Sequence, residues 1–436
     1  MKSDCEVVVT GMGVVSPIGI GPDEFYAALM EGRSGVSVIE SFEQTDLPMR
    51  IGAPVRNFEA KQYVKPRKAL KIMCEPIKFG CAAASMATEQ AGLTGTVNED
   101  GSTVQPVSPD RIGTVLGTET FFADPTEVAR VFRSCIVDSD YQHDRWGEFA
   151  MREIQPLWML KYLPNMAASH ISIAADARGP SNSICQGAAS GLLAIIEAAS
   201  LIKRGVSDVV LAGGTGSQMA LTAMLYRGTD LLSKNIHSPA GASRPFDVNR
   251  DGMVVGEGAG VMVLESKEHA IKRGANIIAS FKGWSRLFSD PSVAAGSENG
   301  GSQKEAAIES SLALAIENAG MSAGDIGMVN ASAGGVIGED RLEAQAIRAV
   351  LGDVPVTAHK SNFGNLGPGT SVVELIGGIL AIERGNIPPT INFEDADPDC
   401  PVNVVAQARE LTKPSLVKTG FSATGQIASV VFSRDH

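Results

Sequence analysis

The chain has 436 residues, of which 44% are hydrophobic, so it can bury a large core in two domains or in one duplicated domain. Its formal net charge of −12 argues against a general binding surface for nucleic acid or for anionic membranes. An acidic protein partner would therefore have to contact a local cluster of lysine and arginine side chains.

The N-terminal part of the chain predicts one strand and two helices. The β-branched run 6–16 predicts a buried central strand that ends in a turn made by Gly11 and Gly13. A helix is expected at 22–31, and an alanine-rich helix at 69–92 whose small side chains favour close packing. Because no third glycine follows at the spacing of a dinucleotide-binding turn, we expect no nucleotide cofactor, and no other cofactor is indicated.

The middle of the chain predicts two further strands and two irregular segments. Polar, proline-containing residues 98–109 predict a surface loop, and the runs 111–118 and 208–214 predict short buried strands. Residues 121–158 mix charged and aromatic side chains. We expect this region to form a helical excursion that covers a pocket or joins a subunit interface.

One stretch, 179–205 (GPSNSICQGAASGLLAIIEAASLIKRG), has the pattern that places a nucleophile at the start of a helix. Residues 183–184 predict the end of a buried strand, and Gly187 predicts a tight turn. The apolar residues after the turn recur at helical spacing, which predicts a helix that begins near Ala188. Unpaired N–H groups at such a helix start lower the pKa of a thiol and stabilise an oxyanion. The alanine at this position can do none of that chemistry.

The second half of the sequence repeats the first. Residues 82–93 resemble residues 310–321, and residues 191–205 resemble residues 371–385, with helix and terminator at the same offsets. An internal duplication explains both pairs. Two copies of an alternating β and α unit, each with a sheet covered by helices, predict an α/β fold with a five-layered αβαβα core.

The stretch 179–205 resembles the active-site segment of the β-ketoacyl-acyl-carrier-protein synthases, the condensing enzymes of fatty-acid and polyketide synthesis. Residues 7–19 (VVVTGMGVVSPIG) and 243–264 (SRPFDVNRDGMVVGEGAGVMVL) extend the resemblance over almost the whole chain. It implies the thiolase-like fold. We expect an N-terminal half, 1–257, that carries the nucleophile position, and a C-terminal half, 258–436, that carries two histidine positions.

In that family a cysteine that becomes acylated and two histidines perform decarboxylative condensation. The cysteine is the nucleophile, and the histidines stabilise the enolate that forms as carbon dioxide leaves. Counting without gaps places the cysteine position on Ala188. The segment 330–343 (NASAGGVIGEDRLE) places the first histidine position on Ser332, and 360–365 (KSNFGN) places the second on Asn365. The resemblance therefore implies that none of the three reactive groups is intact.

The resemblance also implies a retained framework around these positions. Its polar members are Lys360, Glu257, Asp340 and Glu343. In the family's pocket loop Phe421 matches, whereas the phenylalanine that gates the pocket is replaced by Ala423.

Neither of two candidate substitutes fits the lost chemistry. Cys185 precedes the predicted helix start, and we interpret it as a small buried core thiol. His359 precedes Lys360, so strand alternation turns it to the opposite face, and we assign it a structural role. No metal site is predicted. The remaining histidines lie outside both motifs: His143, His170, His237, His269 and His436.

These observations leave three hypotheses for function, and whether the chain is an enzyme stays open. The leading one is a catalytically silent ketosynthase homologue that partners an active 3-oxoacyl-acyl-carrier-protein synthase, as chain-length factors do. Chain-length factors typically carry glutamine at the nucleophile position, whereas here Gln186 precedes Ala188. The second is a homodimer that binds an acyl chain or small apolar ligand. The third is an acyltransferase of weak or altered chemistry that uses Lys360 and Glu257.

The expected partners are an acyl carrier protein and either an active ketosynthase or a second copy of the chain. Six dispersed cysteines without a CxxC pattern predict reduced thiols. No apolar run approaches the ~18 residues of a membrane helix, and no leader is evident at the start. We therefore expect a cytoplasmic protein.

Overall fold

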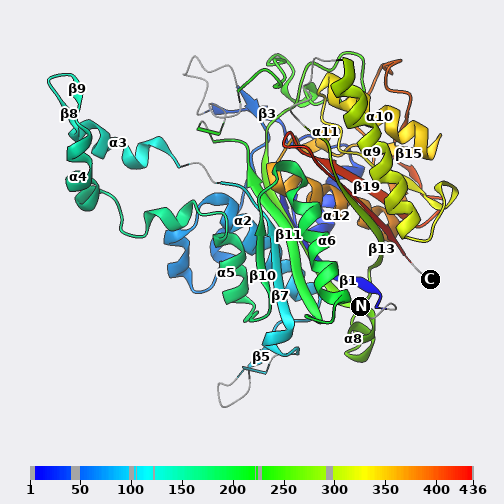
Figure 1. Ribbon diagram of the computed structural model, residues 1–436, viewed down its shortest axis with the longest axis horizontal. Helices are drawn as coiled ribbons and strands as arrows, with labels where there is room; N and C mark the ends of the chain where they lie inside the picture. Colours follow the sequence, from blue (N-terminus) through cyan, green and yellow to red (C-terminus); the bar gives the residue numbers. More distant parts are fainter. Residues whose placement is uncertain are drawn as a thin grey trace.

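A computed structural model describes residues 5–40, 50–97, 103–104, 106–120, 123–220, 222–223, 228–290 and 298–434. Its main strands form one continuous mixed sheet, in which the two halves of the chain meet where β1 pairs with β13 (Figure 1). In sheet order, the strands are β10 (Ser181–Ile184), β7 (Ile112–Gly117), β11 (Val209–Ser217), β12 (Glu257–Ser266), β1 (Val7–Ser16), β13 (Ala279–Phe288), β20 (Gln426–Ser433), β19 (Ser415–Phe421), β14 (Met328–Asn330), β15 (Pro355–Thr357) and β17 (Asn403–Val404), with β2 (Gly19–Ile20) beside β1.

Helices cover both faces of each half of the sheet. Two central helices lie between the halves, α6 (Ser190–Lys203) and α12 (Thr370–Arg384). The outer face of the first half is covered by α2 (Glu75–Gln90) and α5 (Met166–Ala174), and that of the second by α9 (Glu298–Asn318) and α10 (Ile337–Leu351). These layers confirm the predicted thiolase-like αβαβα core, and the repeated segments occupy the equivalent pairs α2/α9 and α6/α12.

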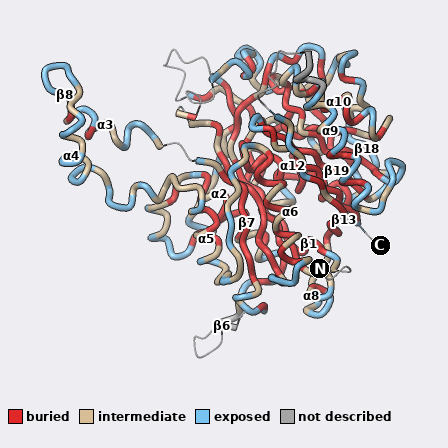
Figure 2. The backbone as a smooth tube through the Cα atoms, in the orientation of Figure 1, coloured by how far each residue is buried: buried red, intermediate tan, exposed pale blue. Residues whose placement is uncertain are grey.

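The two central helices are apolar on nearly all sides because they are enclosed between two sheets. Every residue of α12 from Thr370 to Ile382 is buried, and α6 buries most of its length (Figure 2). In the described residues the remaining helices are α1 (Pro22–Met30), α3 (Pro125–Ser134), α4 (Trp146–Glu153), α8 (Lys267–Lys272) and α11 (Lys360–Phe363). The small two-stranded sheets pair β3 (Ser37–Val38) with β4 (Ile51–Gly52), β5 (Thr96–Val97) with β6 (Thr103–Val104), β8 (Ile136–Val137) with β9 (Asp140–Tyr141), and β16 (Asn386–Ile387) with β18 (Arg409–Glu410).

Two N-terminal predictions need correction. Gly11 and Gly13 do not end the first strand: they lie inside β1, where a Cβ atom would collide with the backbone of α2. They are therefore contact points for a helix rather than turn residues. The predicted helix 69–92 is interrupted, because a 3₁₀ helix at Arg67–Ile72 precedes α2, whose first turn contains Pro76.

The other predicted strands are present. β7 and β11 occupy the runs predicted at 111–118 and 208–214. The predicted loop 98–109 lies partly outside the described residues, and its described part includes β6 and a 3₁₀ helix at Pro109–Arg111. The boundary predicted between 257 and 258 falls at the start of β12, which pairs with β1 and β11 of the first half; the division into two domains remains a prediction.

Residues 123–162 form an arm that reaches away from the sheets rather than lying over them (Figure 1). Its outer part consists of α3, the β8–β9 hairpin and α4. At its base Glu127 accepts hydrogen bonds from Trp158 Nε1 at 2.6 Å and from the Tyr162 hydroxyl at 2.9 Å. Much of the arm is exposed (Figure 2). Several of its large apolar residues are exposed: Phe132, Ile136, Val137, Met151, Leu157 and Met159.

Within the described residues, no helix is both long and apolar enough to cross a membrane. All six cysteines are free thiols.

Candidate functional site

The tight turn predicted at Gly187 is present, with a φ of 58° that favours glycine. It opens a short 3₁₀ helix, Gly187–Ala189, and α6 begins at Ser190, two residues later than predicted. The delay has a local cause, since Ser190 Oγ accepts the N–H of Gln186 at 2.7 Å and donates to the carbonyl of Gly187 at 2.7 Å. Ala188 is half-buried at the start of this helix.

The strand before the turn differs from its prediction. β10 is an edge strand of the sheet rather than a buried one: Ser181 and Asn182 are exposed, and the two residues after them are half-buried. Cys185 is exposed, so the prediction of a buried core thiol was wrong. Cys185 is exposed for the same reason as β10: it directly follows an edge strand, and no further strand of the described chain covers that side of the sheet. The Cys185 Sγ lies 3.5 Å from Thr118 Oγ1.

Loops of the C-terminal half converge on the Ala188 turn. A Cβ atom built on Gly187 would lie 3.3 Å from Cβ of Ser422, in the pocket loop. A Cβ atom on Gly191 would lie 2.8 Å from the carbonyl oxygen of Pro368, just before α12. The fold thus brings the nucleophile position together with the loops that carry Asn365 and Ala423.

Ser332 is tied to two members of the retained framework. Its backbone N–H donates to Glu343 Oε1 at 2.7 Å. Lys360 Nζ donates to the Ser332 carbonyl at 2.5 Å and lies 3.3 Å from its Oγ. The structure therefore places Ser332, Lys360 and Glu343 in one cluster, although these residues come from three separate segments of the sequence.

The same cluster contains two charged residues that the sequence analysis missed. Glu374 of α12 is buried, and its carboxylate lies 3.0 Å from Lys360 Nζ and 2.8 Å from Lys418 Nζ. Burial raises the pKa of Glu374, but the two ammonium groups outweigh it and hold the pKa below its ordinary value. The sequence did contain a signal for both residues, because each is a single charged residue in an otherwise mostly apolar run: Glu374 in SVVELIGG and Lys418 in SLVKTGF.

The other acidic members of the framework titrate differently. Burial raises the pKa of Glu343 to about 7, against the opposing effect of Lys418. Burial likewise raises the pKa of Asp340 to about 6. Asp340 accepts N–H groups from Phe246 at 3.1 Å and Gly335 at 3.0 Å, and the Arg250 guanidinium lies 3.8 Å away. Asp340 therefore orders the loop after Ser332 instead of facing it.

Asn365, at the predicted second histidine position, closes a turn. Its Oδ1 accepts the N–H of Gly367 at 2.9 Å and the hydroxyl of Thr370 at 3.1 Å, while Nδ2 lies 3.4 Å from the sulfur of Met253. The side chain thus caps the turn that leads into α12. His359 is buried behind the cluster, 3.5 Å from Asn330 Nδ2, and burial lowers its pKa to about 4, so it stays neutral near pH 7.

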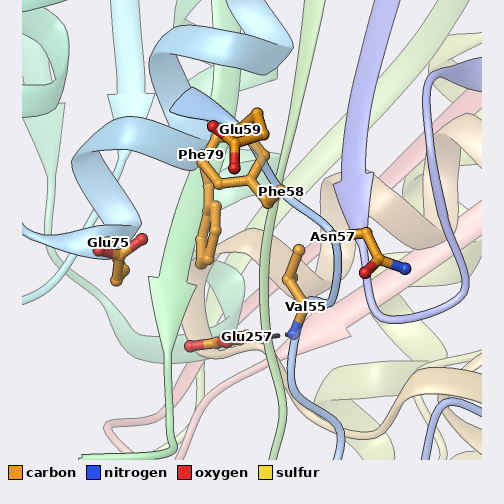
Figure 3. A pocket seen from close by; sticks show the side chains of 7 residues that line it. All are labelled: Val55, Asn57, Phe58, Glu59, Glu75, Phe79 and Glu257. Carbon is orange, nitrogen blue, oxygen red and sulfur yellow. Dashed lines mark hydrogen bonds between the residues drawn. The ribbon is translucent and has the colours of Figure 1, made fainter. Parts of the chain in front are cut away.

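Glu257 lies apart from the Lys360 cluster. Its carboxylate accepts the N–H of Val55 at 3.1 Å and the hydroxyl of Ser217 at 3.1 Å, and burial raises its pKa. It lines a cavity of about 670 Å³ together with other acidic and aromatic side chains (Figure 3). The structure therefore does not bring Lys360 and Glu257 into one hydrogen-bonded group.

The two pocket-loop residues differ in exposure. Phe421 is buried, with Lys304 Nζ 4.7 Å from the centre of its ring. Ala423, at the predicted gate position, is exposed in the single chain.

Two family models together match most of the chain. The β-ketoacyl synthase N-terminal domain matches residues 4–270, and the C-terminal domain matches residues 279–394. The chain belongs to the β-ketoacyl synthase family. The 3-oxoacyl-[acyl-carrier-protein] synthase 2 of Rhizobium meliloti is 32% identical over 445 residues, which cover 98% of each chain.

Solved structures of the β-ketoacyl synthase family have the same fold. A β-ketoacyl synthase from Burkholderia phymatum superposes with a TM-score of 0.85 at 27% identity, over 99% of this chain and 100% of that one. The ishigamide ketosynthase/chain length factor superposes with a TM-score of 0.82 at 26% identity, over 99% and 100%. The assignment of Ala188, Ser332 and Asn365 to the cysteine and histidine positions of the family remains a prediction.

Proposed function

We propose that this β-ketoacyl synthase homologue is catalytically silent and acts as a chain-length-factor-like partner of an active 3-oxoacyl-acyl-carrier-protein synthase. The observation that carries the proposal is the geometry around Ala188. The turn, the helix start and the Lys360–Glu374 pair are in place, but the side chains at the three reactive positions offer no thiol and no imidazole. Loss of a nucleophile together with its electrostatic donors removes most of a rate enhancement.

The two candidate substitutes support the same conclusion. Cys185 precedes the turn, directly after β10, and is exposed, so it does not occupy the position that opens the helix. His359 is buried against Asn330 and neutral, so it serves the packing of the cluster. Neither residue supplies an acylated nucleophile at the position of Ala188.

Two surfaces support pairing with a second ketosynthase-type chain. β10 is a sheet edge whose outer side faces solvent in the described chain, and such an edge can pair with another strand. The arm displays several exposed large apolar side chains, of which Met151 is 86% exposed, and exposed apolar side chains concentrated in one segment favour a protein contact. One structural relative is itself described as a ketosynthase/chain length factor.

An acyl carrier protein is the second proposed partner, because the relatives are named for acting on one. The chain has net negative charge, so docking of an acidic carrier requires a local basic patch. Residues 61–71 provide one, which we call the basic patch: Lys65, Arg67, Lys68 and Lys71 are all exposed. Electrostatic complementarity of this kind raises association rates and selects partners.

Intact-protein mass spectrometry after incubation with acyl- and malonyl-loaded carrier protein tests the proposal, with and without an intact ketosynthase from the same source. Native mass of the mixture gives the assembly state. We expect no acyl adduct on this chain and a stable heterodimer. An adduct mapped to any side chain, Cys185 first, would refute silence.

The alternatives correspond to other results of the same experiment. A homodimer without adducts that retains a noncovalent acyl ligand would favour the binding protein. Condensation product formed by this chain alone would favour an acyltransferase of weak or altered chemistry. Ala188→Cys serves as the positive control, because it shows whether a loaded carrier can deliver its acyl group to the turn.

A further inference from the structure

A second cavity, of about 710 Å³, lies beside α2 and α5 and is bordered by residues 62–73. Cavities that bind small molecules usually have volumes of about 300–1,000 Å³ and mostly apolar walls. Ala188, Ser332 and Asn365 are not among the described residues that line this one, so it is separate from the site around Ala188. Its buried apolar residues are Val64, Met73, Cys81, Ala84, Leu93, Ile171 and Leu211.

One polar side chain in the wall of this cavity lacks a partner. His170 of α5 is only 8% exposed, and its Nε2 atom is buried without a hydrogen-bond partner among the described residues. Burial lowers the pKa of His170, so the imidazole is neutral near pH 7. Buried polar atoms are nearly always hydrogen-bonded, because an unpaired one destabilises the fold. The imidazole therefore marks a point at which a ligand that supplies a hydrogen bond would be stabilised.

The charges of the cavity lie where solvent reaches them. Lys65 and Glu89 are the charged residues among the described lining, and both are exposed. An ionised group of a ligand in the interior would therefore have no buried charge to compensate it, and an uncompensated buried charge is strongly unfavourable. The interior favours a neutral ligand.

We propose that this cavity binds a neutral, mainly apolar small molecule whose hydroxyl group hydrogen-bonds the imidazole of His170. A hydroxyl group both donates and accepts, so it can pair with the free ring nitrogen in either tautomer of the neutral imidazole. The apolar body of the ligand would pack against Met73, Leu93 and Ile171. This binding function goes beyond the proposed role as a ketosynthase partner and does not depend on it.

Three probes with the same ring system test the proposal. 2-Naphthol is neutral at pH 7 and carries one hydroxyl group, naphthalene has no polar group, and 2-naphthoate carries a negative charge. Equilibrium dialysis against the full chain gives the Kd of each. We expect 2-naphthol to bind most tightly and 2-naphthoate least tightly. Failure of 2-naphthol to bind, or equal Kd values for the three probes, would overturn the proposal.

A variant of the histidine separates the hydrogen bond from apolar packing. His170→Phe keeps an aromatic ring but removes both ring nitrogens. The ratio of the Kd of naphthalene to that of 2-naphthol should fall about tenfold in the variant, which is the contribution of one hydrogen bond of ordinary strength. His237→Phe, at an exposed histidine, should keep the wild-type ratio. A wild-type ratio in His170→Phe would show that the imidazole does not bind the hydroxyl group.

A substitution at the surface locates the binding where His170→Phe does not fold. Ala174 ends α5, is exposed and lines the cavity, so Ala174→Trp adds a bulky side chain at its border without disturbing the core. The Kd of 2-naphthol should rise about tenfold or more. Ile271→Trp is the matched control, because Ile271 of α8 is also exposed but lies elsewhere. Equal Kd values in the two variants would place the bound naphthol outside this cavity and overturn the proposal.

Discussion

Lys360 Nζ and Glu374 Oε1 lie 3.0 Å apart, and both side chains are almost fully shielded from solvent. Glu374 sits on the central helix α12, while Lys360 begins the short helix α11. Because Glu374 also pairs with Lys418, one carboxylate compensates two buried ammonium groups. This relationship links the repeated central helix to the loop of Ser332.

Glu374→Gln should therefore be strongly destabilising. The amide leaves both ammonium groups without their carboxylate, and breaking a buried ion pair costs about 3–5 kcal/mol of unfolding free energy. Denaturant unfolding measures the loss. Asp353→Asn is the matched control, because Asp353 pairs with Arg348 at 3.3 Å at the surface and should cost at most about 1 kcal/mol. Equal losses in the two variants would show that the buried pair contributes no more than the exposed one.

Glu343→Gln should change how stability depends on pH. The pKa of Glu343 is raised from 4.5 to about 7 in the fold, so between these values the folded chain holds a proton that the unfolded chain loses. The contribution to unfolding free energy is fully present below about pH 4.5 and is lost as pH rises to about 7. The free energy of unfolding should fall by about 3 kcal/mol over this range, because each unit of pKa shift corresponds to about 1.4 kcal/mol.

The difference between wild type and Glu343→Gln isolates this effect. The lowered pKa of His359 gives the opposite slope, with stability lost as pH falls from 6.5 toward about 4, and it cancels because both proteins contain it. Denaturant unfolding at several pH values should show the variant gaining on wild type between pH 5 and 7. A constant difference across that range would contradict the assignment.

Ala188→Cys should be acylated but should not condense. A thiol at position 188 would lie in the first turn of the 3₁₀ helix that leads into α6, and a helix N-terminus favours the thiolate, so it should react with a loaded carrier protein. Condensation additionally needs donors for the enolate, and each missing donor costs about 10²–10³ in rate. With Ser332 and Asn365 in place, turnover should stay about 10⁴-fold below that of an active ketosynthase. Product assay and intact mass measure the two steps, and Ala188→Ser is the control without a thiol.

Charge reversal in the basic patch should weaken carrier binding. Lys68→Glu/Lys71→Glu replaces two exposed cations of the patch with anions. The double variant should therefore attract an acidic carrier less, and its binding should depend less on salt concentration. We expect about a tenfold or greater rise in Kd at low ionic strength, measured by titration with labelled carrier protein. Lys272→Glu changes an exposed lysine elsewhere. If it weakened binding equally, the effect would reflect net charge rather than this patch.

Much of the architecture could be predicted from local patterns. The β-branched runs at β1, β7 and β11, and the two repeated helix segments, carry their periodicity in consecutive residues, so the layered α/β core followed from them. The exposure of β10 and Cys185 could not be predicted from the sequence, because an edge strand and a central strand differ only in whether another strand lies on each side. Residues 183–184 have the composition of a buried strand, yet the first half of the sheet ends there.

The sequence by itself determined that Ala188, Ser332 and Asn365 are the side chains at the three positions that the family resemblance predicts to be reactive. Only the tertiary structure decided which charges surround them. Glu374 and Lys418 are single charged residues in apolar runs, separated from Lys360 along the chain, and they become partners because α12 and β19 pack against the same loop. The charges of a buried cluster depend on distances in space, and no local pattern records those distances.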